Sequence, residues 1–111
     1  MRFSTYSKLS DVQWNRLQEG NRVDLKRFFG NVSYLARVRY GSRNKAILEL
    51  RRQTGYATTS QTVKYFIDGE FTIANFNLLR AWCILFGLTL VDMLSRDFKA
   101  EQEALEAMKK W

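Results

Sequence analysis

The stretch from Asn75 to Gly87 limits the possible folds of this chain more than any other segment. An asparagine is a favourable N-cap, and a glycine is the usual residue just past a helix C-terminus. Between them, apolar residues recur at positions i, i+3, i+6, i+7 and i+10, which predicts a helix with one apolar face. The expected core residues of this helix are Phe76, Leu79, Trp82, Cys83 and Phe86.

Other segments repeat this combination of a polar cap, helical spacing and a glycine. A helix is expected from Ser10 to about Glu19, because Ser10 and Gln13 have the spacing of a capping box and Gly20 follows. The other expected helices are residues 24–40 with a break at Gly30, Ser42 to about Thr54, a short element beginning at Thr89, and a C-terminal helix within residues 97–111.

The length and composition fit one helical domain. With 111 residues, 46% of them hydrophobic, the chain has apolar area for one core and too little length for two. Proline, which would interrupt helices, is absent from the sequence. We therefore expect an all-α fold in which residues 1–111 form a single domain, a small helical bundle of about five or six helices.

Residue types that carry out catalysis or bind metals are scarce. The chain has no histidine and a single cysteine, Cys83, so the sequence predicts no zinc or other metal site and no internal disulfide. Neither a glycine-rich phosphate loop nor an activated nucleophile is present, and we expect no enzymatic activity and no cofactor. The N-terminus lacks a signal-peptide pattern, and the longest apolar run, residues 81–86, is too short to span a membrane. A cytoplasmic protein without membrane contact is expected.

The positive charge is concentrated in the middle of the chain. Residues 26–64 contain nine Lys or Arg and one acid, Glu49, whereas residues 65–111 contain five bases and seven acids. Lys and Arg that neutralise phosphates release condensed counterions, so a local excess of this kind is typical of a nucleic-acid surface. A solvated basic face is the alternative.

Two segments fit both a helix and a strand. In residues 58–71, TTSQTVKYFIDGEF, Thr58 or Thr59 can cap a helix, but alternating apolar residues before Asp68-Gly69 also suit a β-hairpin. Residues 32–40 likewise alternate, although the apolar residues of residues 24–40 also have helical spacing. We favour a helix in both segments. The residues with helical spacing are Leu25, Phe28, Phe29, Val32, Leu35 and Ala36.

The order of these elements resembles the phage-repressor-like (XRE, lambda-repressor-like) helix-turn-helix family. The residues that carry the resemblance are FGLTLVDML at 86–94, similar to the corner that follows a glycine in that family, and the approach to it, YFIDGEFTIANFNLL. The similarity covers roughly residues 31–94, which would form the helix-turn-helix core. Residues 1–30 would be an N-terminal helical extension, and residues 97–111 a C-terminal helix.

The resemblance implies a DNA reader. Residues 42–54 would be the first helix of the motif and residues 59–67 the recognition helix, with Val63 buried. The implied base-reading residues, which would lie in the major groove of double-stranded DNA, are Ser60, Gln61, Thr62, Lys64 and Tyr65. The implied phosphate contacts are Arg43, Lys45, Arg51, Arg52 and Thr59. The expected protein is a transcriptional regulator of phage or plasmid type that acts as a homodimer.

Some alternatives stay open at this stage. The turn before Val63 is about two residues longer than the family's usual turn, and Arg51 occupies a position where the family normally has a small residue. In a second register, Thr72, Asn75 and Asn77 would read DNA. Two other functions are a protein-interaction module, such as an antitoxin-like or phage accessory protein, and RNA binding with bases stacked on Tyr34, Tyr40, Tyr56 and Tyr65.

Overall fold

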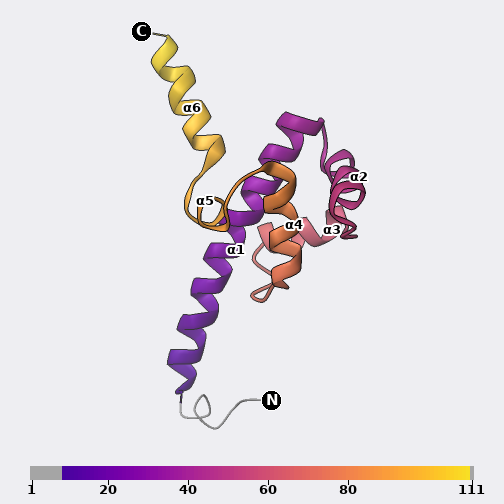
Figure 1. Ribbon diagram of the computed structural model, residues 1–111. Coiled ribbons are helices and arrows are strands. Elements are labelled where there is room, and N and C mark those ends of the chain that lie inside the picture. Colours follow the sequence, from indigo (N-terminus) through magenta and orange to yellow (C-terminus); the bar gives the residue numbers. More distant parts are fainter. Residues whose placement is uncertain (1–8, 111) are drawn as a thin grey trace.

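The computed structural model describes residues 9–110, and within that range it contains six helices and no strand (Figure 1). The helices are α1 (Asp11–Tyr40), α2 (Arg43–Thr54), α3 (Ser60–Ile67), α4 (Phe76–Phe86), α5 (Leu90–Ser95) and α6 (Phe98–Lys109). The predicted all-α bundle is therefore confirmed.

Helix α1 is longer than the sequence predicted. It begins with the expected capping box: the Gln13 N–H donates to Ser10 Oγ at 3.2 Å, and the Ser10 N–H donates to Gln13 Oε1 at 2.8 Å. The predicted end before Gly20 and the predicted break at Gly30 are both wrong, because the helix continues through both glycines to Tyr40. A glycine inside a helix costs only about 1 kcal/mol relative to alanine. Burial of the apolar residues of the same helix offsets that cost.

The second half of α1 lies at the centre of the core, and its predicted helical face is confirmed. The strand alternative for residues 32–40 is wrong, since these residues are helical. Helices α2, α3 and α5 pack against this half of α1, and α4 packs against α2 and α5. Phe29 stacks on Phe66 of α3 with ring centroids 4.2 Å apart, which joins the two helices. The buried residues of this face are Leu25, Phe28, Phe29, Val32, Leu35 and Ala36.

Helix α4 and the corner after it follow the prediction with one exception. The Asn75 side chain caps the helix by accepting a backbone N–H at 2.7 Å. Gly87, at a φ of +67°, reverses the chain so that the Leu88 N–H donates to a carbonyl of the last turn at 3.0 Å. Phe76, however, is wrong as a core residue, because it is 69% exposed. The buried face of α4 begins only at Leu78, so the first residue of the helix projects past the core.

Two helical segments extend away from the core (Figure 1). Residues 11–24 of α1 have no buried side chain, and neither has α6. We call residues 11–24 the N-terminal arm and α6 the C-terminal arm. The molecule is elongated as a result, with principal extents of 53 × 39 × 22 Å.

A buried asparagine holds the base of the C-terminal arm. Asn31, only 3% exposed, donates hydrogen bonds from its side-chain amide to the backbone oxygens of Met93 at 2.9 Å and Arg96 at 2.7 Å. Its Oδ1 accepts a hydrogen bond from the Phe98 N–H at 3.1 Å. Buried polar groups are stable only when they are paired in this way. The start of α6 is therefore tied to the middle of α1.

Candidate nucleic-acid interface

The stretch from residue 58 to residue 71 forms helix α3, as we favoured, and the hairpin alternative is wrong. Thr59 is the N-cap: its Oγ1 accepts a hydrogen bond from the Thr62 N–H at 3.2 Å. The backbone N–H of Asp68 donates to the carbonyl of Lys64 at 2.8 Å and ends the helix. Since the chain then turns at Gly69 with a φ of +77°, Asp68-Gly69 terminates a helix instead of connecting two strands.

A turn of five residues, 55–59, separates α2 from α3, whereas the usual helix-turn-helix turn has about three or four. Tyr56 explains how the longer turn is held, because its side chain packs against the core. Its backbone N–H also donates to Thr54 Oγ1 at 3.2 Å. Arg51 does not obstruct the two helices: its side chain is exposed, and the buried positions of α2 are Ala46 and Leu50.

The side chains of α3 divide into an inner and an outer face. Val63, as predicted, and Phe66 are buried. Gln61, Lys64 and Tyr65 stand at i, i+3 and i+4, so they share the opposite face of the helix. Gln61 and Lys64 are exposed and Tyr65 is half-buried. Three of the five predicted base-reading residues therefore lie together on the outer face.

The other two predicted reading residues are less available. Ser60 is half-buried in the first turn. Thr62 is also half-buried, and its hydroxyl lies 3.1 Å from Thr59 Oγ1. Thr62 is thus part of the cap of α3 and lies nearer its buried side than Gln61 does.

Two residues of the outer face have neighbours of their own. Lys64 Nζ lies 3.3 Å from the Asp68 carboxylate, and both side chains are solvent-exposed. Such exposed pairs contribute at most about 1 kcal/mol, so Lys64 can exchange this partner for a phosphate. The Tyr65 ring packs against Phe71 at 5.1 Å between centroids, which orients its ring. Gln61 makes no hydrogen bond to another described residue and is free to bond with a base.

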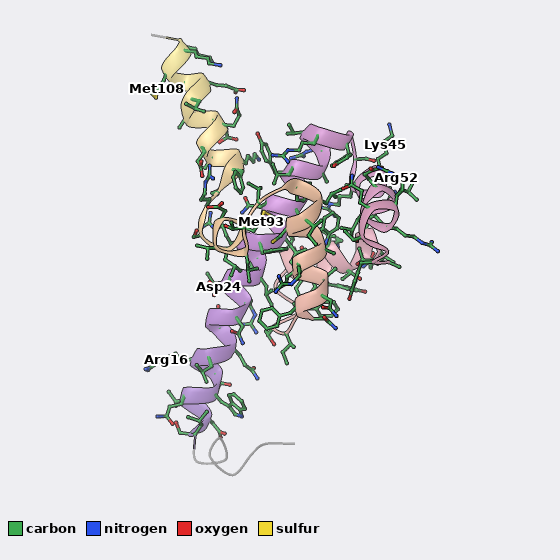
Figure 2. All side chains as sticks on the ribbon, viewed as in Figure 1. Arg16, Asp24, Lys45, Arg52, Met93 and Met108 are labelled. Atoms are coloured by element: carbon green, nitrogen blue, oxygen red, sulfur yellow. The ribbon has the colours of Figure 1, made fainter. Side chains whose placement is uncertain are left out.

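The predicted phosphate contacts on α2 differ in availability. Lys45 and Arg52 project from α2 away from the core (Figure 2). Arg43 is half-buried and its Nε donates to Ser33 Oγ of α1 at 3.0 Å. Arg52 forms an ion pair with Glu49, and this hydrogen bond lowers the pKa of the Glu49 carboxyl to about 2.

Three cations of α2, Arg43, Lys45 and Arg51, have no ion pair within residues 9–110, and of these Lys45 and Arg51 are exposed. Lys45 lies three residues after the N-cap Ser42, and its backbone N–H donates to the Ser42 hydroxyl at 3.2 Å. The side chain of Lys45 is exposed. Thr59, the remaining predicted phosphate contact, is exposed at the start of α3. The side chains best placed for phosphates around α3 are therefore Lys45, Arg51 and Lys64.

The basic stretch 26–64 does not form one continuous positive face. Arg27 pairs with Asp97 at the base of α6 at 2.9 Å. Arg39 donates to the Phe86 backbone oxygen at 2.7 Å and lies over the Phe86 ring. These two arginines stabilise the fold. The charge count from sequence therefore overstates the positive charge that α2 and α3 present.

The second register receives no support from the geometry. Residues 68–75 separate α3 from α4, which is twice the length of a usual helix-turn-helix turn. Asn75 uses its side chain to cap α4, and Thr72 is half-buried. The tyrosines proposed for RNA stacking are also partly buried: Tyr34, Tyr40 and Tyr56 pack against the core.

Two features near this surface were not predicted from sequence. Arg22 of the N-terminal arm donates from Nε to the Gly69 backbone oxygen at 3.0 Å, which ties α1 to the end of α3. Arg80 lines a groove between α4 and α5. The sequence contains no local signal for the Arg22 contact, because its two residues are 47 positions apart.

We also searched the described residues for a metal site, a reactive cysteine and a membrane-spanning helix. Residues 9–110 contain no group of three His, Cys, Asp or Glu side chains that could hold a metal ion. Burial raises the pKa of the Cys83 thiol, so this cysteine is not activated as a nucleophile. Among the helices described, none is long and apolar enough to cross a membrane.

Comparison with family models, with curated proteins and with solved structures found no match for this chain.

Proposed function

We propose that the protein binds double-stranded DNA in a sequence-specific manner and regulates transcription. The observation that carries the proposal is the outer face of α3. It is a short, capped helix that follows another helix across a turn, and Gln61, Lys64 and Tyr65 share its exposed side. Helices of this kind enter the major groove in helix-turn-helix proteins.

The proposed roles follow from the side-chain chemistry. Gln61 can donate and accept hydrogen bonds at once, which suits the N6 and N7 atoms of adenine. Tyr65 would contact a base edge or sugar next to it. Lys45, Arg51 and Lys64 would bind phosphates, which sets the position of α3 without specifying sequence.

The regulator would act as a homodimer in the cytoplasm. One copy of α3 reaches only a few base pairs, and a twofold pair doubles the contacts on a palindromic site. No cofactor, metal or membrane has a role in this proposal.

The test is a selection of bound sequences from a random duplex library, followed by titration of the variants. Gln61→Ala should reduce the preference for the selected sequence over random duplex by about 1–3 kcal/mol. Lys45→Ala should weaken all duplexes alike and lower the salt dependence of binding. Gln18→Ala, in the N-terminal arm, is the matched glutamine control and should bind as the wild type does. Equal affinity of the wild type for selected and random duplex would refute sequence reading.

A protein-interaction module is the second candidate, because large apolar side chains are exposed outside α3. Phe76, Ile84 and Val91 are each more than half exposed. Absence of binding to duplex DNA and to single-stranded RNA at two salt concentrations would favour this candidate.

A further inference from the structure

A chain of packed aromatic rings connects the core to the outer face of α3. Phe29 of α1 stacks on Phe66, which is only 3% exposed. Phe71, in the segment after α3, packs edge-on against Phe66 and at a tilt against Tyr65, with 5.1 Å between the ring centroids in both pairs. Tilted and edge-on pairs are favourable arrangements of aromatic side chains. The Tyr65 ring is therefore held by rings that are anchored in the core.

Tyr65 also lies beside Gln61, the residue proposed to bind adenine. The two side chains are four residues apart on the outer face of α3, which makes them neighbours. Tyr65 is half-buried and Phe71 is 38% exposed, so part of this aromatic pair is accessible. The outer face of α3 thus combines an amide with an aromatic ring that is fixed in place.

The chemistry of the base edges indicates what this ring can recognise. Of the four bases, only thymine carries a C5-methyl group in the major groove, and apolar side chains contact that methyl. Guanine is most often bound by the planar fork of arginine, and α3 contains no arginine. Because glutamine suits adenine and an aromatic ring suits the thymine methyl, the outer face of α3 is complementary to A·T base pairs.

We infer that the ring of Tyr65 reads the C5-methyl group of a thymine close to the adenine that Gln61 binds. Four residues of an α-helix rise about 6 Å, and base pairs stack about 3.4 Å apart. The thymine should therefore lie within about two base pairs of that adenine. The inference rests on the proposed function and names A·T base pairs as the class of site that α3 reads.

The experiment replaces each thymidine of the selected duplex with deoxyuridine, which removes only the methyl group, and measures the Kd by titration. The adenine is located as the base at which Gln61→Ala loses its preference. Within about two base pairs of it, one deoxyuridine should raise the Kd of the wild type about fourfold, the effect of losing one buried methyl group. At that position Tyr65→Ala should bind both duplexes equally. Tyr65→Phe should keep the fourfold difference, because the ring makes the contact and the hydroxyl does not.

Two further variants separate reading from support of the ring. Phe71→Ala should reduce the deoxyuridine effect, since the Tyr65 ring loses its neighbour. Phe76→Ala, which removes an exposed aromatic side chain outside α3, is the matched control and should keep the full effect. Circular dichroism should show wild-type helix content for each variant. The deoxyuridine series on the wild type needs no substitution in the protein, so it decides the question even if Tyr65→Ala unfolds.

Three results would overturn the inference. They are a wild type that is indifferent to deoxyuridine near the adenine, a deoxyuridine effect that persists in Tyr65→Ala, and an effect that is lost in Tyr65→Phe. A selected site built of G·C base pairs would also overturn it and would leave sequence-specific binding intact. A wild type without any sequence preference would overturn the proposed function as well, so the two failures are distinguishable.

Discussion

The two halves of α1 belong to one continuous helix but lie in different surroundings. Residues 11–24 form the exposed N-terminal arm, whereas residues 25–36 provide the centre of the core. The backbone geometry is the same, so any difference in stability between them comes from what their side chains bury. The chain supplies matched residues in both halves, which allows the effect of packing to be measured directly.

Leucine substitutions should give the largest difference in unfolding free energy between the two halves of α1. Leu25 is buried, and Leu17 in the arm is half exposed. Leu25→Ala should lower the free energy of unfolding by about 2–5 kcal/mol, because it removes buried methyl groups and leaves a cavity. Leu17→Ala should change it by less than about 0.5 kcal/mol. Urea denaturation followed by circular dichroism measures both, and similar losses would mean that the arm is packed in solution.

Asparagine substitutions should give the next largest difference in unfolding free energy between the two halves of α1. Asn31→Ala leaves the Met93 and Arg96 carbonyls and the Phe98 N–H without their partner. Unpaired buried groups cost about 1–3 kcal/mol, and the base of α6 should become more mobile. Asn21→Ala in the exposed arm should have little effect on unfolding. Amide exchange of residues 96–100 measures the loosening, and unchanged protection in Asn31→Ala would contradict this role for the side chain.

Substitution of the two glycines of α1 should stabilise the helix, whereas the leucine and asparagine substitutions destabilise the protein. Apart from the neighbouring backbone of α1 itself, neither glycine has an atom within 4 Å of the position that a Cβ would take, so alanine fits at both. Gly30→Ala should stabilise the protein by about 0.5–1 kcal/mol, because glycine is the poorer helix former. Gly20→Ala should increase the helix content of the arm and leave the urea midpoint nearly unchanged. An equal rise in both midpoints would show that the arm unfolds together with the core.

The smallest effect concerns pH and extends the comparison to α2 and the C-terminal arm. Since the pKa of Glu49 is lowered from 4.5 to about 2, its ion pair with Arg52 stabilises the protein fully above pH 4.5. That contribution is lost as the pH falls through about 2. The difference between wild type and Glu49→Gln should therefore shrink on acidification. Glu101, whose hydrogen bonds from Arg96 also lower its pKa, lies on the arm. Because Asn31 ties the backbone of Arg96 to α1, the difference between wild type and Glu101→Gln should shrink on acidification in the same direction.

Most helix boundaries could be predicted because their signals are local. The caps Ser42, Thr59, Asn75 and Thr89 each bond a backbone N–H within three residues. Such contacts depend on neighbouring residues alone and are visible in a sequence. The glycines of α1 are the opposite case: their local penalty is real, but packing of distant helices against residues 25–36 outweighs it.

The candidate site was only partly predictable for the same reason. The outer face of α3 follows from helical spacing and the position of Val63. The availability of each cation does not, because Arg27 pairs with a residue 70 positions away and Arg39 bonds a carbonyl 47 positions away. Phe76 was wrongly predicted to be buried. Its spacing matches the apolar face of α4, but the core does not reach the first two residues of that helix.

The hydrogen bond from Arg22 to the Gly69 carbonyl places a boundary within α1. No side chain of residues 11–21 is buried, so fraying of these residues exposes little new surface. Opening of the helix beyond Arg22, in contrast, must release the end of α3. In amide exchange, protection should therefore rise near residue 22, several residues before the first buried side chain. Substitution of Arg22 should move that rise toward Leu25 and speed exchange at the last turn of α3.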